Sequence, residues 1–147
     1  MEIRLRAAGA EDFEFLLSVR RITMKSYAEA TWGVWNEGAQ QNDVRSELDR
    51  QSERIIIFGG KDVGCLNVED LGDALFVHFI GILPEYQRRG LGTRLMQQVL
   101  AEGDQKQIPV RLNVLRVNPA LSLYERLGFR IVGGDEYRHH MERSSLP

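Results

Sequence analysis

The residues best suited to bind an anion lie in one short run, Leu83 to Thr93, with the sequence LPEYQRRGLGT. A strongly apolar stretch from Ala74 to Leu83 precedes this run, and apolar residues at helical spacing follow it. The pattern therefore predicts a loop between a strand and a helix. The first turn of a helix exposes unpaired backbone N–H groups and the positive end of the helix dipole, which together attract phosphate groups.

The composition of the loop favours the same use. Gly90 and Gly92 lack a Cβ and would let a phosphate approach the backbone, and Arg88 and Arg89 add positive charge beside them. The GxxxxGK[ST] spacing of a P-loop is absent, and so is the GxGxxG spacing of the dinucleotide-binding fold. Taken alone, the two glycines would also fit an ordinary turn between a strand and a helix.

A second informative run lies at Asn118 to Phe129, with the sequence NPALSLYERLGF. Asn118 is typical of a helix N-cap, Pro119 of the first helical position, and Gly128 of the residue that ends a helix. Tyr124 lies inside this predicted helix. A phenol has an ordinary pKa near ~10, so it keeps its proton at neutral pH and can donate it. The alternative is that Tyr124 only packs against its helical neighbours.

The two runs resemble the two signatures of the GNAT superfamily of N-acetyltransferases. Gln87-x-x-Gly90-x-Gly92 after a strand resembles the acyl-CoA-binding loop, and the run from Asn118 resembles N-x-A-x-x-x-Y-x-x-x-G-F in loose form. The order and separation of the signatures match as well, and the resemblance covers essentially the whole chain. It implies direct transfer of an acetyl group from acetyl-CoA to a primary amine in a ternary complex.

The resemblance also implies roles for particular residues. Contacts to acetyl-CoA would come from the strand end, the loop and the start of the later helix: Ile82, Leu83, Gln87, Arg88, Arg89, Gly90, Leu91, Gly92, Thr93 and Asn118. The strand before the loop splays from its neighbour, Val110 to Val114, and an N–H near Ile82 would polarise the thioester carbonyl. Tyr124 would protonate the departing CoA thiolate.

The sequence offers several candidates for the base that takes the proton of the amine. Some GNAT members carry a glutamate on the strand before the loop, but Phe76 stands at that position here. His78 lies two residues further along on the same face and is one candidate, although a histidine there also fits a hydrogen-bonded core residue. Glu69, Asp70 or a chain of water molecules are the alternatives.

The segment between the first two helices commonly borders the acceptor pocket in the family. Here it contains the aromatic residues Tyr27, Trp32 and Trp35 together with Glu29 and Glu37. Aromatic rings and carboxylates suit a cationic amine. The same residues would also fit a core or a dimer surface, and both a small-molecule amine and a protein amine remain open as acceptors.

These residues need a scaffold, and the hydrophobic periodicity predicts one. Together with the resemblance, the order of the predicted elements implies a mixed, mostly antiparallel α/β (α+β) sheet of about seven strands with helices on both faces. The resemblance further implies a single acyl-CoA N-acyltransferase domain spanning residues 1–147. The expected strands are Glu2 to Ala7, Arg54 to Phe58, Val63 to Glu69, Ala74 to Leu83, Val110 to Val114, Arg130 to Val132 and Tyr137 to Glu142. The expected helices are Ala10 to Ala30, a polar helix ending near Gln51 after a loop from Ala30 to Asn42, Leu91 to Glu102, and one from Asn118 to Gly128.

Composition limits the remaining possibilities. The 147 residues carry 19 Lys and Arg against 21 Asp and Glu, which speaks against a nucleic-acid-binding protein. No apolar run is long enough to span a membrane, and the single cysteine, Cys65, indicates the cytoplasm and a small buried thiol. His139 and His140 are adjacent and point to opposite faces of a strand, so no metal site is expected. A homodimer is compatible with the resemblance.

Two other functions would use the same loop. One is a non-catalytic acyl-CoA-binding sensor or regulatory module, which the missing strand glutamate would favour. The other is a domain that binds a different phosphate ligand, such as a nucleotide.

Overall fold

The computed structural model describes residues 1–147 and contains two compact units. The first unit comprises residues 1–68 and 79–92, and the second comprises residues 69–78 and 93–147. The strands are β1 (Ile3–Ala7), β2 (Glu53–Phe58), β3 (Lys61–Asp70), β4 (Leu75–Ile82), β5 (Val110–Leu115), β6 (Arg130–Gly134) and β7 (Arg138–Arg143). The helices are α1 (Phe13–Trp32), α2 (Glu37–Asp49), α3 (Leu91–Lys106) and α4 (Ala120–Arg126), with short 3-10 turns at Ala10–Asp12 and Pro84–Tyr86.

The strands form one seven-stranded sheet in the order β1-β2-β3-β4-β5-β7-β6. β2 pairs antiparallel with β1 and with β3, and β7 pairs antiparallel with β5 and with β6. Only β4 and β5 form a parallel pair among the registers that the structure defines. The α/β class and the mostly antiparallel sheet of seven strands predicted from the sequence are thus confirmed. The single domain remains a prediction.

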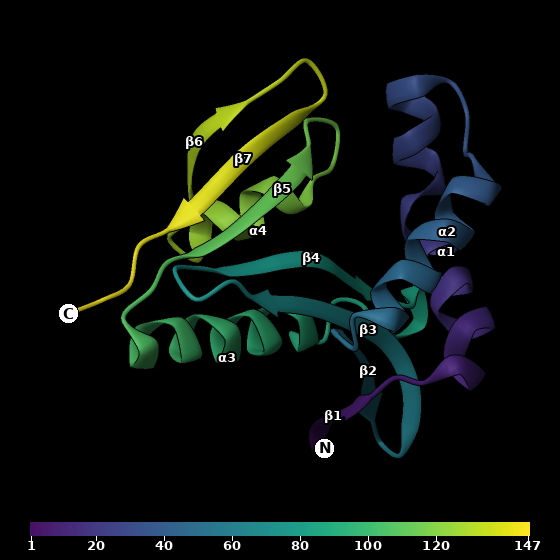
Figure 1. Cartoon of the computed structure of the whole chain (residues 1–147), viewed down its shortest axis with the longest axis horizontal. Helices are drawn as coiled ribbons and strands as arrows, with labels where there is room; N and C mark the ends of the chain where they lie inside the picture. The colour runs from purple at the N-terminus through teal and green to yellow at the C-terminus, as the bar shows by residue number, and fades with distance from the viewer. The chain divides into compact units, whose positions relative to one another are not determined.

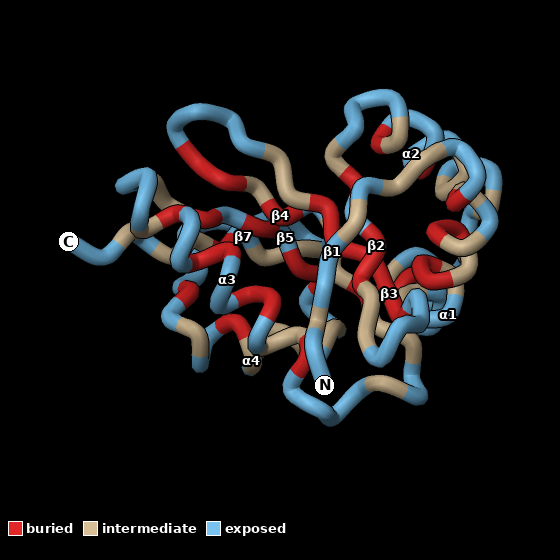
Figure 2. Tube along the Cα trace, turned by 90° about the horizontal axis from the view of Figure 1, so that it is seen from below, coloured by how far each residue is buried: buried red, intermediate tan, exposed pale blue.

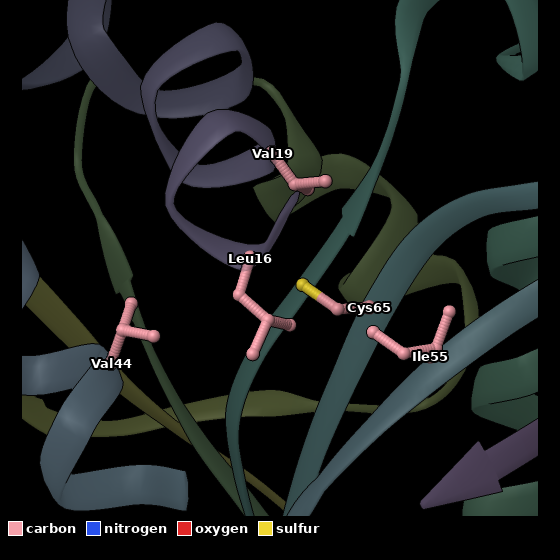
Figure 3. Close-up of a cluster of buried hydrophobic side chains, with 5 residues drawn as sticks. All are labelled: Leu16, Val19, Val44, Ile55 and Cys65. Atoms are coloured by element: carbon pink, nitrogen blue, oxygen red, sulfur yellow. The ribbon is translucent and has the colours of Figure 1, made fainter. Parts of the chain in front are cut away.

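The core of the first unit lies between α1, α2 and the strands β2 and β3. Leu16 and Val19 of α1 meet Val44 of α2, Ile55 of β2 and Cys65 of β3, and all five side chains are fully buried (Figure 3). Ile55 and Cys65 are partners in the β2–β3 register, so their side chains share one face of the sheet. The buried stretches of β2 and β3 stand out in Figure 2.

The first unit also holds three charged groups in its interior. Arg20 of α1 contacts Glu47 of α2 and lies 3.1 Å from Glu53 Oε1 of β2. All three residues are buried, Glu53 almost completely at 1% exposure. The guanidinium therefore joins two helices to the sheet, with one more carboxyl group than it can neutralise.

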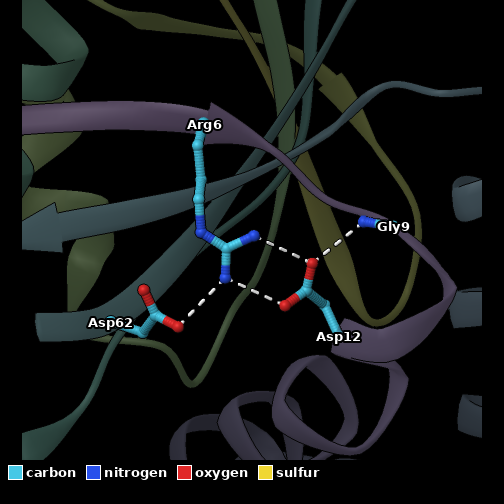
Figure 4. Close-up of polar contacts among 4 residues, drawn as sticks. All are labelled: Arg6, Gly9, Asp12 and Asp62. Atoms are coloured by element: carbon cyan, nitrogen blue, oxygen red, sulfur yellow. Dashed lines mark hydrogen bonds and ion pairs between the residues drawn. The ribbon is translucent and has the colours of Figure 1, made fainter.

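Near the N-terminus, a second ion pair fixes the chain between β1 and α1. Both terminal nitrogens of Arg6 donate to Asp12, at 3.0 and 2.9 Å, and one of them also donates to Asp62 at 3.0 Å (Figure 4). The amide of Gly9 donates to Asp12 Oδ2 at 2.9 Å. Arg6 holds the pKa of the Asp12 carboxyl below its usual range, mainly through these hydrogen bonds.

In the second unit, β5, β7 and β6 lie side by side (Figure 1). Burial alternates along β5, because Val110, Leu112 and Val114 are buried while Arg111 and Asn113 are exposed. α3 lies against the buried face, where a Cβ added to Gly103 would come within 2.9 Å of the Val110 side chain. The other face of β5 carries polar side chains.

Two predictions about the elements are wrong. The expected loop from Ala30 to Asn42 is only four residues long, because α1 continues to Trp32, Gly33 ends it with a left-handed backbone (φ 81°), and α2 begins at Glu37. The Asn36 side chain caps α2 by accepting a hydrogen bond from the amide of Ala39. β4 is central in the sheet as expected, but it is not buried on both faces, since His78 is exposed.

None of the helices has both the length and the apolar character that a membrane-spanning segment needs.

Candidate functional site

The end of β4 leads into the loop from Leu83 to Thr93, and close backbone packing in the first unit fixes the end of this strand. The amide of Leu83 donates to the carbonyl of Val63 on β3 at 2.9 Å. A Cβ on Gly64 would lie 2.1 Å from the carbonyl oxygen of Gly81, so the two strands approach each other here as only glycine allows. The carbonyl of Leu83 accepts a hydrogen bond from the Tyr86 amide at 2.9 Å, so both backbone groups of Leu83 are engaged within the protein.

The loop itself has an unusual backbone. Pro84–Tyr86 forms a 3-10 turn, and the Gln87 side chain then reaches back to donate to the Ile82 carbonyl at 2.8 Å. Arg88 and Gly90 both have a positive φ, 64° and 76°, before α3 begins at Leu91. A non-glycine residue in this region costs roughly 1–2 kcal/mol, so the surrounding structure must hold Arg88 in place.

The space around the loop fits a phosphate-bearing ligand. A Cβ added at Gly90 would meet no atom within 4 Å, and one at Gly92 would meet only the Ile82 side chain at 3.7 Å. Neither glycine is therefore required by packing against the protein. Arg88 and Arg89 are exposed, and the Arg89 guanidinium lies 5.6 Å from the centre of the Tyr86 ring. Open space and positive charge beside a helix start suit the pyrophosphate of CoA, although the Gln87 amide already donates to the Pro84 carbonyl at 3.2 Å.

Tyr124 lies on α4 in the second unit. The side chain of Asn118 accepts a hydrogen bond from the amide of Ala120 at 2.9 Å and so caps this helix, which begins one residue later than the sequence predicts. Gly128 ends the helix with a φ of 98°, as expected. Tyr124 is 8% exposed and meets Phe129 edge-on, with 5.8 Å between ring centres. Burial alone raises the pKa of Tyr124 to about 12.

The candidate bases separate into two groups in the second unit. His78 Nε2 lies 2.8 Å from Glu69 Oε1, and the His78 ring contacts Phe76 with 4.8 Å between ring centres. Asp70 instead pairs with Lys106 at 2.6 Å. That pair, together with a hydrogen bond from the Gly72 amide, holds the pKa of Asp70 below its usual value. Asp70 is therefore a poor proton acceptor, whereas Glu69 and His78 form one hydrogen-bonded pair.

Parallel pairing of β4 with β5 covers three residues. Leu75, Phe76 and Val77 face Val110, Arg111 and Leu112 in this register. His78 is the next residue of β4, so it follows directly after the paired segment.

The three aromatic residues expected at the acceptor site lie in the first unit. Tyr27 and Trp32 belong to the last turns of α1, and Trp35 lies in the connection to α2. Trp32 is 43% exposed. The Trp35 indole N–H donates to Glu37 at 2.9 Å. The Arg21 guanidinium also binds Glu37 and holds the pKa of that carboxyl below its usual value.

The expected site residues are thus divided between the two units. The first contains Tyr27, Trp32, Trp35, Ile82, Leu83 and Gln87 to Gly92, and the second contains His78, Thr93, Asn118 and Tyr124. Of these, Gln87 and Ile82 contact each other directly. Cys65 is fully buried, and burial raises the pKa of its thiol, which argues against a nucleophilic role.

Sequence reasoning missed two contacts. It treated Glu69 and His78 as rivals, because residues nine apart on different strands give no signal of pairing. It also missed the interior cluster of Arg20, Glu47 and Glu53, because charged side chains are usually solvent-exposed.

Comparison with known proteins adds independent information. A family model described as an acetyltransferase (GNAT) domain matches residues 51–131, a range that includes both the loop and Tyr124. The N-alpha-acetyltransferase RimI of Mycobacterium tuberculosis is 38% identical over 81 residues. That match covers 51% of this chain and 49% of RimI, so the chain aligns with about half the length of this curated relative.

Solved structures show the same fold at low sequence identity. The PaiA N-acetyltransferase of Thermoplasma acidophilum, in complex with coenzyme A, has a TM-score of 0.76 and 22% identity, covering 98% of this chain and 99% of that one. The ribosomal-protein-S18-alanine N-acetyltransferase of Escherichia coli has a TM-score of 0.73 and 19% identity, covering 99% and 96%.

Proposed function

Because the chain belongs to the GNAT family of acetyltransferases, we propose that it transfers an acetyl group from acetyl-CoA directly to a primary amine in a ternary complex. The observation that carries this proposal is the family match over residues 51–131, since one continuous match includes the Gln87-x-x-Gly90-x-Gly92 loop and Tyr124. The open, positively charged loop supports acetyl-CoA as the donor.

Each group of residues has its own role in the proposed reaction. Backbone amides from Arg88 to Thr93 hold the pyrophosphate, since the Gln87 amide donates to the Pro84 carbonyl. Ile82, Leu83 and Asn118 align the pantetheine arm. Tyr124 protonates the departing thiolate, a role supported by the raised pKa that keeps its phenol protonated at neutral pH. Tyr27, Trp32 and Trp35 face the acceptor.

The acceptor that we propose to test first is the α-amino group of a peptide. The name of the relative RimI describes an N-alpha-acetyltransferase, and the similar structure from Escherichia coli is named for an alanine of a ribosomal protein. An exposed aromatic residue such as Trp32 suits a cationic amino terminus.

The experiment measures release of free CoA from acetyl-CoA with a thiol-reactive dye. Three acceptors are tested. They are a hexapeptide that begins with alanine, the same hexapeptide with an acetylated N-terminus and one lysine side chain, and spermidine. Cys65 is buried and so adds little background. We expect release that depends on an acceptor, with a matching gain of one acetyl group by mass spectrometry. Binding of acetyl-CoA, seen as a raised melting temperature, without release for any acceptor would instead indicate a non-catalytic module.

A further inference from the structure

We propose that Glu69 and His78 work as a pair, in which His78 accepts the proton of the acceptor amine and Glu69 is the positioning residue that holds the imidazole. This inference rests on the proposed function and names the base for that same reaction. It is carried by the hydrogen-bond contact between the two side chains, which joins two residues that the sequence offers as alternative bases.

The hydrogen bond determines which nitrogen is available. Glu69 Oε1 and His78 Nε2 are 2.8 Å apart, and an ionised carboxylate can only accept a hydrogen bond. In a neutral imidazole the proton must therefore sit on Nε2, which leaves the lone pair on Nδ1. The carboxylate also stabilises the imidazolium that forms when Nδ1 takes up a proton.

The surroundings hold the ring while leaving it accessible. The Phe76 ring lies against the imidazole, with 4.8 Å between centres. The side chain of His78 is 28% exposed and that of Glu69 is 36% exposed, so neither is enclosed in the core. The interpretation of His78 as a buried core histidine therefore does not apply.

No other candidate in the second unit combines these properties. Asp70 is neutralised by Lys106, which lowers its pKa and weakens it as a base. Phe76, also on β4, carries no group that can accept a proton. His78 lies two residues further along the strand, with Glu69 supplying the carboxylate from β3.

The proposed step balances as follows. The amine nitrogen forms a bond to the acetyl carbonyl carbon while its proton passes to His78 Nδ1. The bond between that carbon and the CoA sulfur then breaks, and the sulfur takes a proton from Tyr124. Solvent then takes the proton from His78 and returns one to Tyr124, which restores both side chains. The products are the N-acetylated acceptor and free CoA, with no change in oxidation state.

The test compares His78→Gln, Glu69→Gln and Glu69→Ala with Asp70→Asn as the matched control, using acetyl-CoA and the alanine-initiated hexapeptide between pH 6.5 and 9.5. We expect His78→Gln to lower kcat by ~10²-fold or more near neutral pH, with little change in KM for acetyl-CoA. Its deficit should shrink as pH rises, because α-amino groups with a pKa near ~8 then lose their proton to solvent. Asp70→Asn should match the wild type.

The two Glu69 variants separate orientation from charge. Glutamine can still accept the hydrogen bond from Nε2 but carries no charge, whereas alanine offers neither. We therefore expect Glu69→Ala to lose more kcat than Glu69→Gln, and both to lose less than His78→Gln. A thermal melt in the presence of acetyl-CoA confirms that each variant is folded and binds the donor.

The outcomes distinguish this inference from the proposed function. Wild-type turnover with full activity in His78→Gln, or with a deficit that does not change with pH, would overturn the pairing alone. A larger loss in Glu69→Gln than in His78→Gln would make Glu69 the base and also overturn it. No CoA release by the wild type with any acceptor of the panel would overturn the proposed function and the pairing together.

Discussion

At the scale of single residues, removing the hydroxyl group of Tyr124 tests directly whether this residue is the proton donor. Tyr124→Phe keeps the buried ring and its contact with Phe129 while deleting the proposed proton donor. We expect kcat to fall by ~10²-fold with little change in acetyl-CoA affinity or melting temperature. Burial raises the pKa of Tyr124 to about 12, so the loss should be equal at pH 6.5 and pH 9.

Steady-state kinetics at these two pH values check this prediction, with Tyr137→Phe as the control. Tyr137 is an exposed tyrosine of the same unit and lies outside the proposed site. If Tyr124→Phe turned over as fast as the wild type, Tyr124 would be a packing residue only.

The local sequence was sufficient to identify residues whose role depends on neighbours along the chain. Asn118 and Gly128 bound α4 because capping is a property of the local backbone. The contact between Glu69 and His78, by contrast, depends on how two strands are placed side by side. A single sequence does not specify that placement.

At the scale of elements, the close approach of β3 and β4 depends on Gly64. A Cβ there would lie 2.1 Å from the Gly81 carbonyl oxygen, far inside van der Waals contact with backbone that cannot rotate away. We expect Gly64→Ala to lower the free energy of unfolding by ~1–3 kcal/mol or more. It should also weaken acetyl-CoA binding, since the displaced end of β4 carries Ile82 and is followed directly by Leu83.

Urea unfolding and acetyl-CoA titration of Gly64→Ala measure both effects. Gly38→Ala is the matched control: Gly38 lies in α2, and its added Cβ would meet only the Asn36 side chain, at 3.6 Å. Because alanine favours a helix over glycine by ~1 kcal/mol, this control should be neutral or more stable. Equal stability of the two variants would show that β3 and β4 can separate without cost.

The elements also show where periodicity succeeds and where it fails. The large apolar residues of α3 lie at helical spacing, as the sequence predicts, and all of them are buried: Leu91, Leu95, Met96, Val99 and Leu100. The end of α1 and the start of α2 were missed because the segment from Ala30 to Asn42 contains two tryptophans and two glycines, which is typical of an irregular loop. In the structure, Gly33 only ends one helix and Gly38 lies inside the next.

At the scale of the whole molecule, folding stability should reflect the buried cluster of Arg20, Glu47 and Glu53. Two carboxyl groups share one guanidinium, and several polar atoms around them have no protein partner, among them Glu53 Oε2, Arg20 Nε and both polar atoms of the Asn67 side chain. Such atoms destabilise the fold unless internal water binds them. A proton on one carboxyl group removes the excess negative charge.

Burial, followed by the neighbouring Glu47, raises the pKa of Glu53 to about 8 from the ordinary value of 4.5. Between these values the folded chain binds a proton that the unfolded chain has released, so stability falls as pH rises. The slope has an upper limit of about 1.4 kcal/mol per pH unit.

Urea unfolding should therefore show the wild type less stable at pH 8 than at pH 6. Glu53→Gln, which mimics the protonated carboxyl in shape, should abolish this difference, while Glu136→Gln at an exposed position should retain it. A wild-type stability that is flat or rises over this range would mean that Glu53 is ionised in the folded chain and neutralised by Arg20.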